Sequence, residues 1–359
     1  MKVVDYQQAP LLVIWEVTRA CSLACVHCRA SAEDVRDSRE LSLDEGKRLL
    51  SEVASMGTPL FVLTGGDPLQ RDDLEALIRH GKSQGLVMAT IPAATPRLTR
   101  ERVLRLRDSG VDQLALSLDG ATAVQHDDFR KVEGTFSKVM EASAWIREAG
   151  VPLQINTVLG SWNRQDFGAL AQTVTDLGAI FWEIFFLVPT GRGQGLVGCT
   201  AQEFEDLFEQ IHSLSLTAPF TVKVTEGQHY RRWFVQHDNV ERRATFGHAA
   251  RLVAPRPVNA GNGFAFVDHT GEVFPSGFLP VSAGNVRMDS LVDVYRNSSL
   301  FRMLRTPEAN VGKCGYCDYR KLCGGSRARA YAFTGDYLAG DPCCTYQPSE
   351  KSLAADGRG

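Results

Sequence analysis

The sequence predicts an α/β fold: a partial (βα)6 barrel followed by a small domain with a β-hairpin and a cysteine cluster. Over residues 1–198, apolar β-branched runs alternate with amphipathic stretches, a pattern typical of parallel strands joined by helices. After residue 198 this alternation weakens, and from Asn259 short apolar runs flank a Thr270-Gly271 turn. The nine cysteines cluster towards the two ends of the chain, with Cys199 alone between them.

Six strand–helix units are predicted in the barrel. The strands are expected at 12–17, 59–64, 86–91, 113–118, 153–159 and 181–188. The helices are expected at 42–56, 72–84, 99–109, 136–149, 166–177 and 201–214. Ser42 with Glu45 has the form of a capping box, and Thr99 can cap the third helix. Since active sites of such barrels lie at the carboxyl ends of the strands, we expect a cofactor at the loop after the first strand.

The expected division of the chain has four parts. Residues 1–198 form the barrel, 199–258 a bridging region, 259–346 the small C-terminal domain and 347–359 a disordered tail. In the C-terminal domain, 263–268 and 272–274 are expected to pair as a hairpin, and 290–296 and 299–304 to be helical.

Composition excludes several classes of partner. A net charge of −3 gives no electrostatic case for binding nucleic acid. The chain has no apolar run of about 18 residues, so no transmembrane helix is expected. The first ten residues lack a signal-peptide pattern, and clustered cysteines in a reducing compartment indicate metal rather than disulfides. We therefore expect a cytoplasmic metalloprotein.

The most informative motif is Cys21-x3-Cys25-x2-Cys28, directly after the first predicted strand. Three thiolates can hold three irons of a [4Fe–4S] cluster and leave the fourth iron open to a small molecule. Buried structural cysteines or half of a zinc site are the alternatives. The motif resembles the signature of radical S-adenosylmethionine (SAM) enzymes, which implies a TIM-like partial barrel and reductive cleavage of SAM to a 5′-deoxyadenosyl radical. His27 stands where that family usually has an aromatic residue.

The same resemblance implies where SAM binds. Gly65-Gly66-Asp67-Pro68, after the second strand, resembles the Gly-Gly-Glu-Pro motif that holds the amino group of SAM, with Asp67 in place of Glu. Later strand ends are expected to contact the ribose, carboxylate or adenine of SAM through Ser117, Asp119, Asn156, Leu187 and Val188. Ala93-Ala94 stands where the family often has Asn-Gly.

A second cysteine set lies near the C-terminus as Cys314-x2-Cys317-x5-Cys323, with Cys343-Cys344 further on. Four thiolates can complete the coordination of one metal centre, and a structural zinc site is the alternative. With the glycine pair that follows Cys323, the set resembles a SPASM domain, the extension of radical SAM enzymes that carries auxiliary [4Fe–4S] clusters.

Two serines limit the number of auxiliary clusters. Ser276 and Ser326 stand where that resemblance leads us to expect cysteines. We therefore expect one auxiliary [4Fe–4S] cluster, with Cys344 as the fourth ligand beside Cys314, Cys317 and Cys323. Cys343 is the competing fourth ligand, and Cys199 is expected to be a bystander.

The substrate is suggested by a narrower resemblance. Residues 314–346, and motifs at 15–19, 25–30, 126–130, 154–157, 187–193 and 269–273, resemble radical SAM enzymes of the siroheme-dependent haem pathway. These enzymes remove carboxylates from tetrapyrroles, so cationic anchors are expected, for which arginine is well suited. The candidates are Arg19, Arg29, Arg192, Arg231 and Arg232, with His229 and Tyr230 as an iron ligand or hydrogen-bond donor.

The resemblance implies a radical SAM oxidoreductase that decarboxylates or otherwise modifies a tetrapyrrole side chain, supplied with electrons by a donor such as flavodoxin or ferredoxin. One alternative is a maturase that forms a thioether or carbon–carbon bond in a ribosomally made peptide. The other is a non-catalytic metal-binding protein with zinc at both ends.

Overall fold

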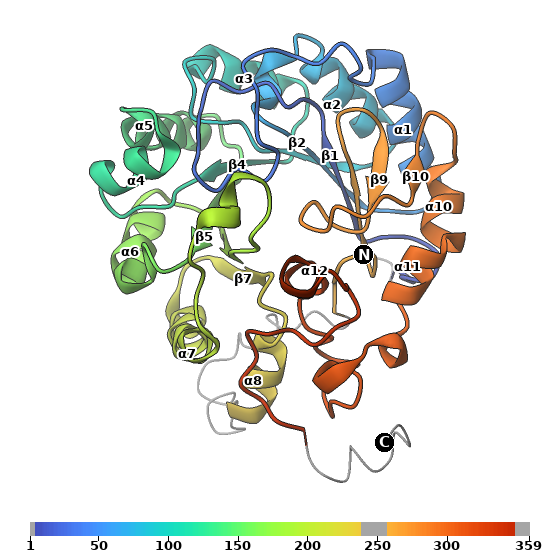
Figure 1. Cartoon of the computed structure of the whole chain (residues 1–359). Coiled ribbons are helices and arrows are strands. Elements are labelled where there is room, and N and C mark those ends of the chain that lie inside the picture. Colours follow the sequence, from blue (N-terminus) through green and yellow to red (C-terminus); the bar gives the residue numbers. More distant parts are fainter. Residues whose placement is uncertain (1–3, 238–256, 349–359) are drawn as a thin grey trace.

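The computed structural model describes residues 4–237 and 257–348 and confirms the predicted α/β fold (Figure 1). Within these residues one sheet has the strand order β10-β9-β8-β1-β2-β3-β4-β5-β6-β7. Neighbours from β8 to β7 pair in parallel, whereas β8–β9 and β9–β10 are antiparallel. The strands are β1 (Leu12–Glu16), β2 (Leu60–Thr64), β3 (Val87–Thr90), β4 (Gln113–Ser117), β5 (Leu153–Leu159), β6 (Phe181–Phe186), β7 (Thr221–Thr225), β8 (Phe264–Val267), β9 (Glu272–Phe274) and β10 (Gly284–Asn285).

Helices form an arc around the strands, and α10 and α11 continue this arc beside β8–β10 (Figure 1). The helices are α1 (Leu43–Ser55), α2 (Leu74–Ser83), α3 (Arg100–Asp108), α4 (Ala123–Arg130), α5 (Thr135–Glu148), α6 (Phe167–Asp176), α7 (Ala201–Thr217), α8 (Tyr230–His237), α10 (Leu291–Asn297), α11 (Ser299–Leu304) and α12 (Arg327–Thr334). No helix in the described part of the chain is both long and apolar enough to cross a bilayer.

The helix starts follow local chemistry. Ser42 and Glu45 form the predicted capping box at α1, since each side chain bonds the other residue's backbone N–H. Thr99 caps α3 by accepting a hydrogen bond of 3.1 Å from the N–H of Arg102. These bonds satisfy N–H groups that the first turn of a helix leaves without partners.

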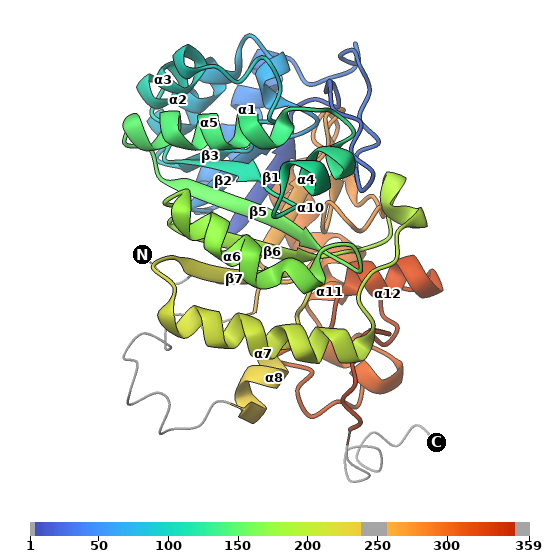
Figure 2. The same cartoon turned by 90° about the vertical axis from the view of Figure 1, so that its left-hand side faces the viewer.

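Some elements were not predicted from the sequence. β7 and α8 lie in the segment expected to bridge two domains, and α4 and α12 lie in segments for which no element was predicted. In β7, Thr-Val-Lys-Val-Thr, only Val222 is buried, so the alternating β-branched pattern is confined to five residues. α7 runs along the outside of the molecule with α8 beside it (Figure 2).

The predicted hairpin is present and extends the barrel sheet. β8 and β9 pair antiparallel, and β8 also pairs in parallel with β1, with Leu12 opposite Phe264. The C-terminal segment is therefore joined to the barrel through backbone hydrogen bonds at the β1 edge. The predicted domain bounds remain predictions. Residues 238–256 of the bridging region and 349–359 of the predicted tail lie outside the described residues.

Candidate active site

The first cysteine motif lies in the loop directly after β1. Cys21 and Cys25 are buried with Leu23 in a small apolar cluster, against which Cys28 packs. Each of the three sulfurs accepts one N–H. The donors are Leu23 N (3.4 Å to Cys21), Ala32 N (3.4 Å to Cys28) and Arg130 Nη1 (3.5 Å to Cys25). Donors aimed at sulfur stabilise thiolates, so this loop fits an iron–sulfur cluster.

Burial raises the pKa of Cys21 to about 12, so the binding of iron to this sulfur would have to displace the thiol proton. Within residues 4–237 and 257–348, no three Cys, His, Asp or Glu side chains gather closely enough to hold a single metal ion. This finding does not apply to a [4Fe–4S] cluster. Each thiolate ligand of such a cluster binds a different iron, so the ligands lie further apart than those of a single ion.

The glycine turn after β2 packs directly on the start of the cysteine loop. The N–H of Gly66 donates to the carbonyl of Thr18, and that of Asp67 donates to the carbonyl of Ala20, both at 2.8 Å. A Cβ on Gly66 would lie 2.5 Å from the carbonyl oxygens of Arg19 and Ala20. Only glycine permits this approach, which joins two of the predicted SAM-site loops.

The carboxylate of Asp67 holds the loop after β3. It accepts hydrogen bonds from Thr95 Oγ1 (2.7 Å), Leu69 N (3.1 Å) and Ala93 N (3.3 Å), and burial raises its pKa. Ala93 occupies the position where the sequence departs from the family's Asn-Gly pair. The carboxylate of Asp67 therefore fixes the position of the loop after β3 through these hydrogen bonds.

A buried ion pair connects the cysteine loop with the ends of β4 and β5. Asp119 is paired with Arg130 and accepts a hydrogen bond of 2.7 Å from the N–H of Val158. Burial alone would raise the pKa of Asp119, but the charge of Arg130 and smaller contributions from neighbouring groups together outweigh burial, so the pKa is lowered. Arg130 therefore touches both a predicted cluster ligand and a predicted SAM contact. Its role was missed, although it lies in the 126–130 motif.

His27 forms one end of an aromatic stack. Its ring lies 4.6 Å from that of Phe129, at an interplanar angle of 14°, and Phe129 stacks on Trp162 at 4.9 Å. Burial lowers the pKa of His27 to about 4, so the ring is neutral at pH 7. A neutral, stacked imidazole can act as the aromatic side chain that is usual at this position.

The remaining predicted SAM contacts lie at strand ends. Ser117 of β4 is directly opposite Asn156 of β5 in the parallel register. Asn156 accepts a hydrogen bond of 2.7 Å from the Gln154 side chain. Leu187 and Val188 follow β6 and are buried. The geometry is compatible with the predicted roles and does not test them.

Three of the arginines predicted to bind substrate make contacts within the protein. Arg19 and Arg29 both pair with the buried carboxylate of Glu16, and Arg29 also lies over the ring of Phe266. Burial opposes ionisation of Glu16, but Arg29, followed by His269 and Arg19, lowers its pKa to about 2. Arg192 donates from Nε to the carbonyl of Cys25 at 3.0 Å, so it braces the cysteine loop.

The second cysteine set lines a cavity together with His229 and Arg232. Its lining includes four sulfur ligands predicted from the sequence, Cys314, Cys317, Cys323 and Cys344. Each of these sulfurs has an N–H donor. The donors are Asp341 N (3.4 Å to Cys314), Tyr319 N (3.4 Å to Cys317), Gly325 N (3.3 Å to Cys323) and Arg232 Nη2 (3.8 Å to Cys344). Four convergent, N–H-bonded thiols fit a cluster with complete protein ligation.

Cys343 and Cys199 lie outside this cavity lining. The Cys343 thiol is directed to the carbonyl of Cys199 at 3.9 Å. Ser326, at a position where a cysteine was expected, caps α12 and donates to the buried carboxylate of Glu226. Ser276 is also buried and accepts a hydrogen bond of 3.2 Å from the N–H of Phe278.

The bridging-region candidates gather near this cavity. His229 and Arg232 line it, and Arg232 also pairs with Glu205. Arg231 donates to the carbonyl of Val258 at 3.0 Å, and Tyr230 packs on Phe208. Of these four residues, His229 and Arg232 lie beside the second cysteine set, and the substrate contacts predicted for them remain predictions.

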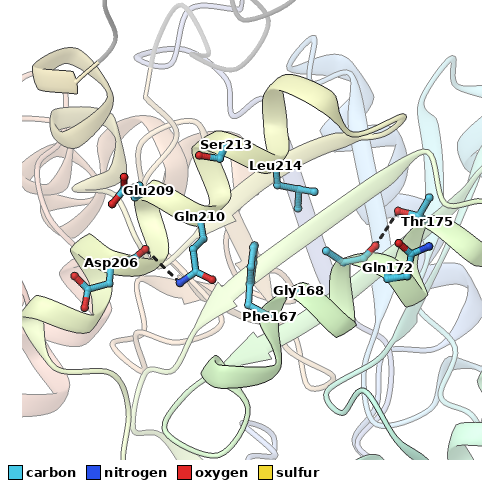
Figure 3. Close-up of a pocket in the computed structure, with 10 residues that line it drawn as sticks. Phe167, Gly168, Gln172, Thr175, Asp206, Glu209, Gln210, Ser213 and Leu214 are labelled. Carbon is cyan, nitrogen blue, oxygen red and sulfur yellow. Dashed lines mark hydrogen bonds between the residues drawn. The ribbon is translucent and has the colours of Figure 1, made fainter.

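A larger groove lies elsewhere, between α6 and α7 (Figure 3). It has a volume of about 730 Å³ and is lined by Phe167 and Gln172 on one side and Glu209 and Gln210 on the other. It contains no residue of the predicted site and lies on the outer helical layer. Although this groove is larger than the cavity at the second cysteine set, it is not the candidate active site, because it contains none of the predicted residues.

A barrel with a three-cysteine loop after its first strand is the architecture of enzymes that bind a cluster with one open iron. The sequence model of the Radical SAM superfamily matches residues 15–174. The AdoMet-dependent heme synthase of Methanosarcina barkeri is 39% identical over 96% of this chain and 98% of that protein. The protein of the same name from Nitratidesulfovibrio vulgaris is 39% identical over 94% and 92%. The chain belongs to the radical SAM superfamily and is a radical SAM enzyme.

More distant relatives have other names. The mycofactocin maturase MftC of Mycobacterium tuberculosis is 31% identical over 97% of this chain and 86% of that protein. Among solved structures, Streptococcus suis SuiB bound to S-adenosylmethionine matches with a TM-score of 0.74 at 16% identity, covering 94% of this chain and 78% of that chain. Such matches confirm the fold. Family membership implies SAM and a [4Fe–4S] cluster, and it removes the non-catalytic metal-binding alternative.

Proposed function

We propose that this enzyme converts carboxylate side chains of an iron tetrapyrrole by oxidative decarboxylation, with haem as the product. The observation that carries the proposal is the 39% identity, over nearly the whole chain, to proteins named AdoMet-dependent heme synthase. A further relative, 28% identical, is named Fe-coproporphyrin III synthase. Iron coproporphyrin III is therefore the substrate to test first.

The proposed site has two clusters, one on Cys21, Cys25 and Cys28 and one on Cys314, Cys317, Cys323 and Cys344. The first, with SAM, supplies a carbon radical that removes one hydrogen atom from the propionate side chain. The side chain then loses carbon dioxide and one electron and becomes a vinyl group. The second cluster is the proposed acceptor of that electron, and a low-potential carrier of the flavodoxin or ferredoxin type is the proposed donor to the first.

Residues of the chain position the loops that would bind the first cluster and SAM. The turn at Gly65 and Gly66 fixes the loop that would face the amino group of SAM. Arg130 donates to the sulfur of Cys25 and neutralises Asp119. The apolar surroundings of Cys21 and Cys25 limit the access of water, which would otherwise hydrolyse the cluster.

The test is an anaerobic assay on reconstituted protein. Wild type incubated with iron coproporphyrin III, SAM and dithionite is expected to yield haem, 5′-deoxyadenosine and carbon dioxide. Mass spectrometry should show the loss of carbon dioxide and two hydrogens for each converted side chain. If 5′-deoxyadenosine forms but the tetrapyrrole is unchanged, the substrate assignment is wrong.

Two adjacent cysteines provide a matched pair for the second cluster. Cys344→Ala should remove about half of the iron and leave SAM cleavage, because only one of two four-iron sites is lost. Cys343→Ala should keep all of the iron, since its thiol lies outside the cavity lining. Equal iron in the two variants, measured with acid-labile sulfide, would contradict the assignment of Cys344.

Maturation of a ribosomally made peptide is the second candidate function. It is favoured by relatives named mycofactocin maturase, at 31% identity, and PqqA peptide cyclase, at 29%. Their precursor peptides, added in place of the tetrapyrrole, distinguish the two candidates. A cross-linked or decarboxylated peptide, with no change to the tetrapyrrole, would favour this alternative.

A further inference from the structure

His229 is a buried imidazole for which the described residues provide no hydrogen bond. Its side chain is inaccessible to solvent, and neither ring nitrogen has a partner within hydrogen-bond distance. The ring is held between Phe204, at 4.7 Å between centroids, and Phe208, at 4.8 Å. The aromatic packing thus positions a polar ring whose N–H is unused.

This ring lines the cavity that also contains the four sulfurs of the second cysteine set. Two buried carboxylates beside it are satisfied. Asp341 binds Arg329 at 3.0 Å through both oxygens, and Glu226 accepts from Ser326. Since buried polar atoms are nearly always hydrogen-bonded, the exception at His229 indicates a partner that belongs in the cavity.

Burial keeps the imidazole of His229 neutral. Burial lowers the pKa of His229 to about 3, so the ring carries one N–H and one acceptor nitrogen at pH 7. The carboxylate of Asp341 lies 4.0 Å from Nδ1, beyond hydrogen-bond range. Neither ring nitrogen is therefore engaged by the described residues, and the one that carries the N–H can donate into the cavity.

We propose that His229 donates a hydrogen bond to a sulfur of the cluster held by Cys314, Cys317, Cys323 and Cys344, and so raises its reduction potential. The inference rests on the proposed second cluster. Reduction adds negative charge to the cluster, so a donor to its sulfur stabilises the reduced form more than the oxidised form. His229 is a positioning residue in this role, since it favours electron uptake without touching the reacting side chain.

The test is a redox titration of the second cluster alone, followed by electron paramagnetic resonance. The full chain with Cys21, Cys25 and Cys28 replaced by Ala isolates this cluster. In that background His229→Phe keeps the aromatic packing but removes the N–H. It should make one-electron reduction about tenfold less favourable, a fall of about 59 mV. His229→Gln, which retains a donor, should recover part of that loss.

His212→Phe is the matched control, since His212 is a buried histidine of α7 that does not line the cavity. It should leave the potential unchanged. An unchanged potential in His229→Phe, with full iron, overturns the role of His229 but not the second cluster. If the triple-alanine background binds no iron, the second cluster itself fails, and the inference with it.

A second measurement needs no substitution of His229. In the triple-alanine background labelled with ¹⁵N-histidine and with His229 intact, the reduced second cluster should show one weak nitrogen hyperfine coupling, as expected for a hydrogen bond to sulfur. The absence of any coupling overturns the proposal. A strong coupling also overturns it, because that would mean His229 ligates iron directly.

Discussion

At the scale of single residues, a buried carboxylate stands at or just after the carboxyl ends of β1, β2 and β4, and each one holds a neighbouring loop. Glu16 binds Arg29 of the cysteine loop, Asp67 binds Thr95, and Asp119 binds Arg130. A carboxylate is costly to bury unless it is paired or hydrogen-bonded. These side chains therefore position the predicted SAM-site loops.

Breaking the Asp119–Arg130 pair should cost far more than breaking a surface pair. Arg130→Met leaves the charge of Asp119 buried and unpaired, which typically destabilises by about 3–5 kcal/mol. Adding Asp119→Asn should restore part of that stability but not the N–H bond to the Cys25 sulfur. Urea unfolding of cluster-free, reduced protein measures the change in stability. The iron content of the N-terminal site measures the effect of losing the N–H bond to the Cys25 sulfur.

Arg100→Met is the control, since its pair with Glu148 is exposed on both sides. It should cost less than about 1 kcal/mol. If Arg130→Met is as mild as Arg100→Met, the ion pair does not hold the loop.

At the scale of elements, α1 packs on β1 through a glycine. A Cβ on Gly46 would lie 2.6 Å from the Trp15 ring and 2.8 Å from Leu77. Trp15 is fully buried and cannot withdraw. The close contact between α1 and β1 therefore depends on the absence of a side chain at position 46.

Gly46→Ala should destabilise the protein even though alanine favours helices. Overpacking a tight core contact costs about 1–3 kcal/mol, which outweighs the roughly 1 kcal/mol gained in helix propensity. Gly168 of α6 is the matched control, since nothing lies within 4 Å of its Cβ position. Gly168→Ala should be neutral or stabilising in the same thermal unfolding measurement, and equal effects at both positions would contradict the packing argument.

At the scale of the whole molecule, one ion cluster joins the N-terminal cysteine loop to the C-terminal hairpin. Nδ1 of His269, in the β8–β9 turn, lies 3.3 Å from Glu16, and its Nε2 lies 3.5 Å from Asp37. Glu16 also binds Arg29. The parts of the chain that carry the two cysteine sets are thus linked by charge as well as by the β1–β8 pairing.

This link should depend on pH. Burial would lower the pKa of His269, but the hydrogen bond with Glu16 and the charges of Glu16 and Asp268 together outweigh burial and raise the pKa above its ordinary 6.5. A raised pKa in the folded state means that the stabilisation is fully present below pH 6.5 and is lost as pH rises through the raised value. The difference in unfolding free energy between wild type and His269→Gln should therefore shrink as pH increases above 6.5. A difference that is constant from pH 6 to 9 would contradict the ion-pair role.

Much of the fold was predictable because its signals are local. The alternating apolar runs, the capping box at Ser42 and the turn at Thr270-Gly271 all act within a few residues, and the structure confirms the elements that they predict. The unpredicted elements have weaker signals. β7 is only five residues long and buries only Val222, and the buried residues of α12 include two arginines, so neither element presents a clear apolar face.

The sequence by itself determined the two cysteine sets, because the spacing within each loop is short and thiol chemistry does not depend on the fold. Only the tertiary structure decided which side chains meet them. Arg130 reaches the sulfur of Cys25 from 105 positions away, and Arg232 reaches that of Cys344 from 112. The lining of the cavity by Cys344 rather than Cys343, and the burial of His229 there, likewise depend on distant segments. Such contacts arise from packing between segments that are far apart in the chain, so no local sequence pattern predicts them.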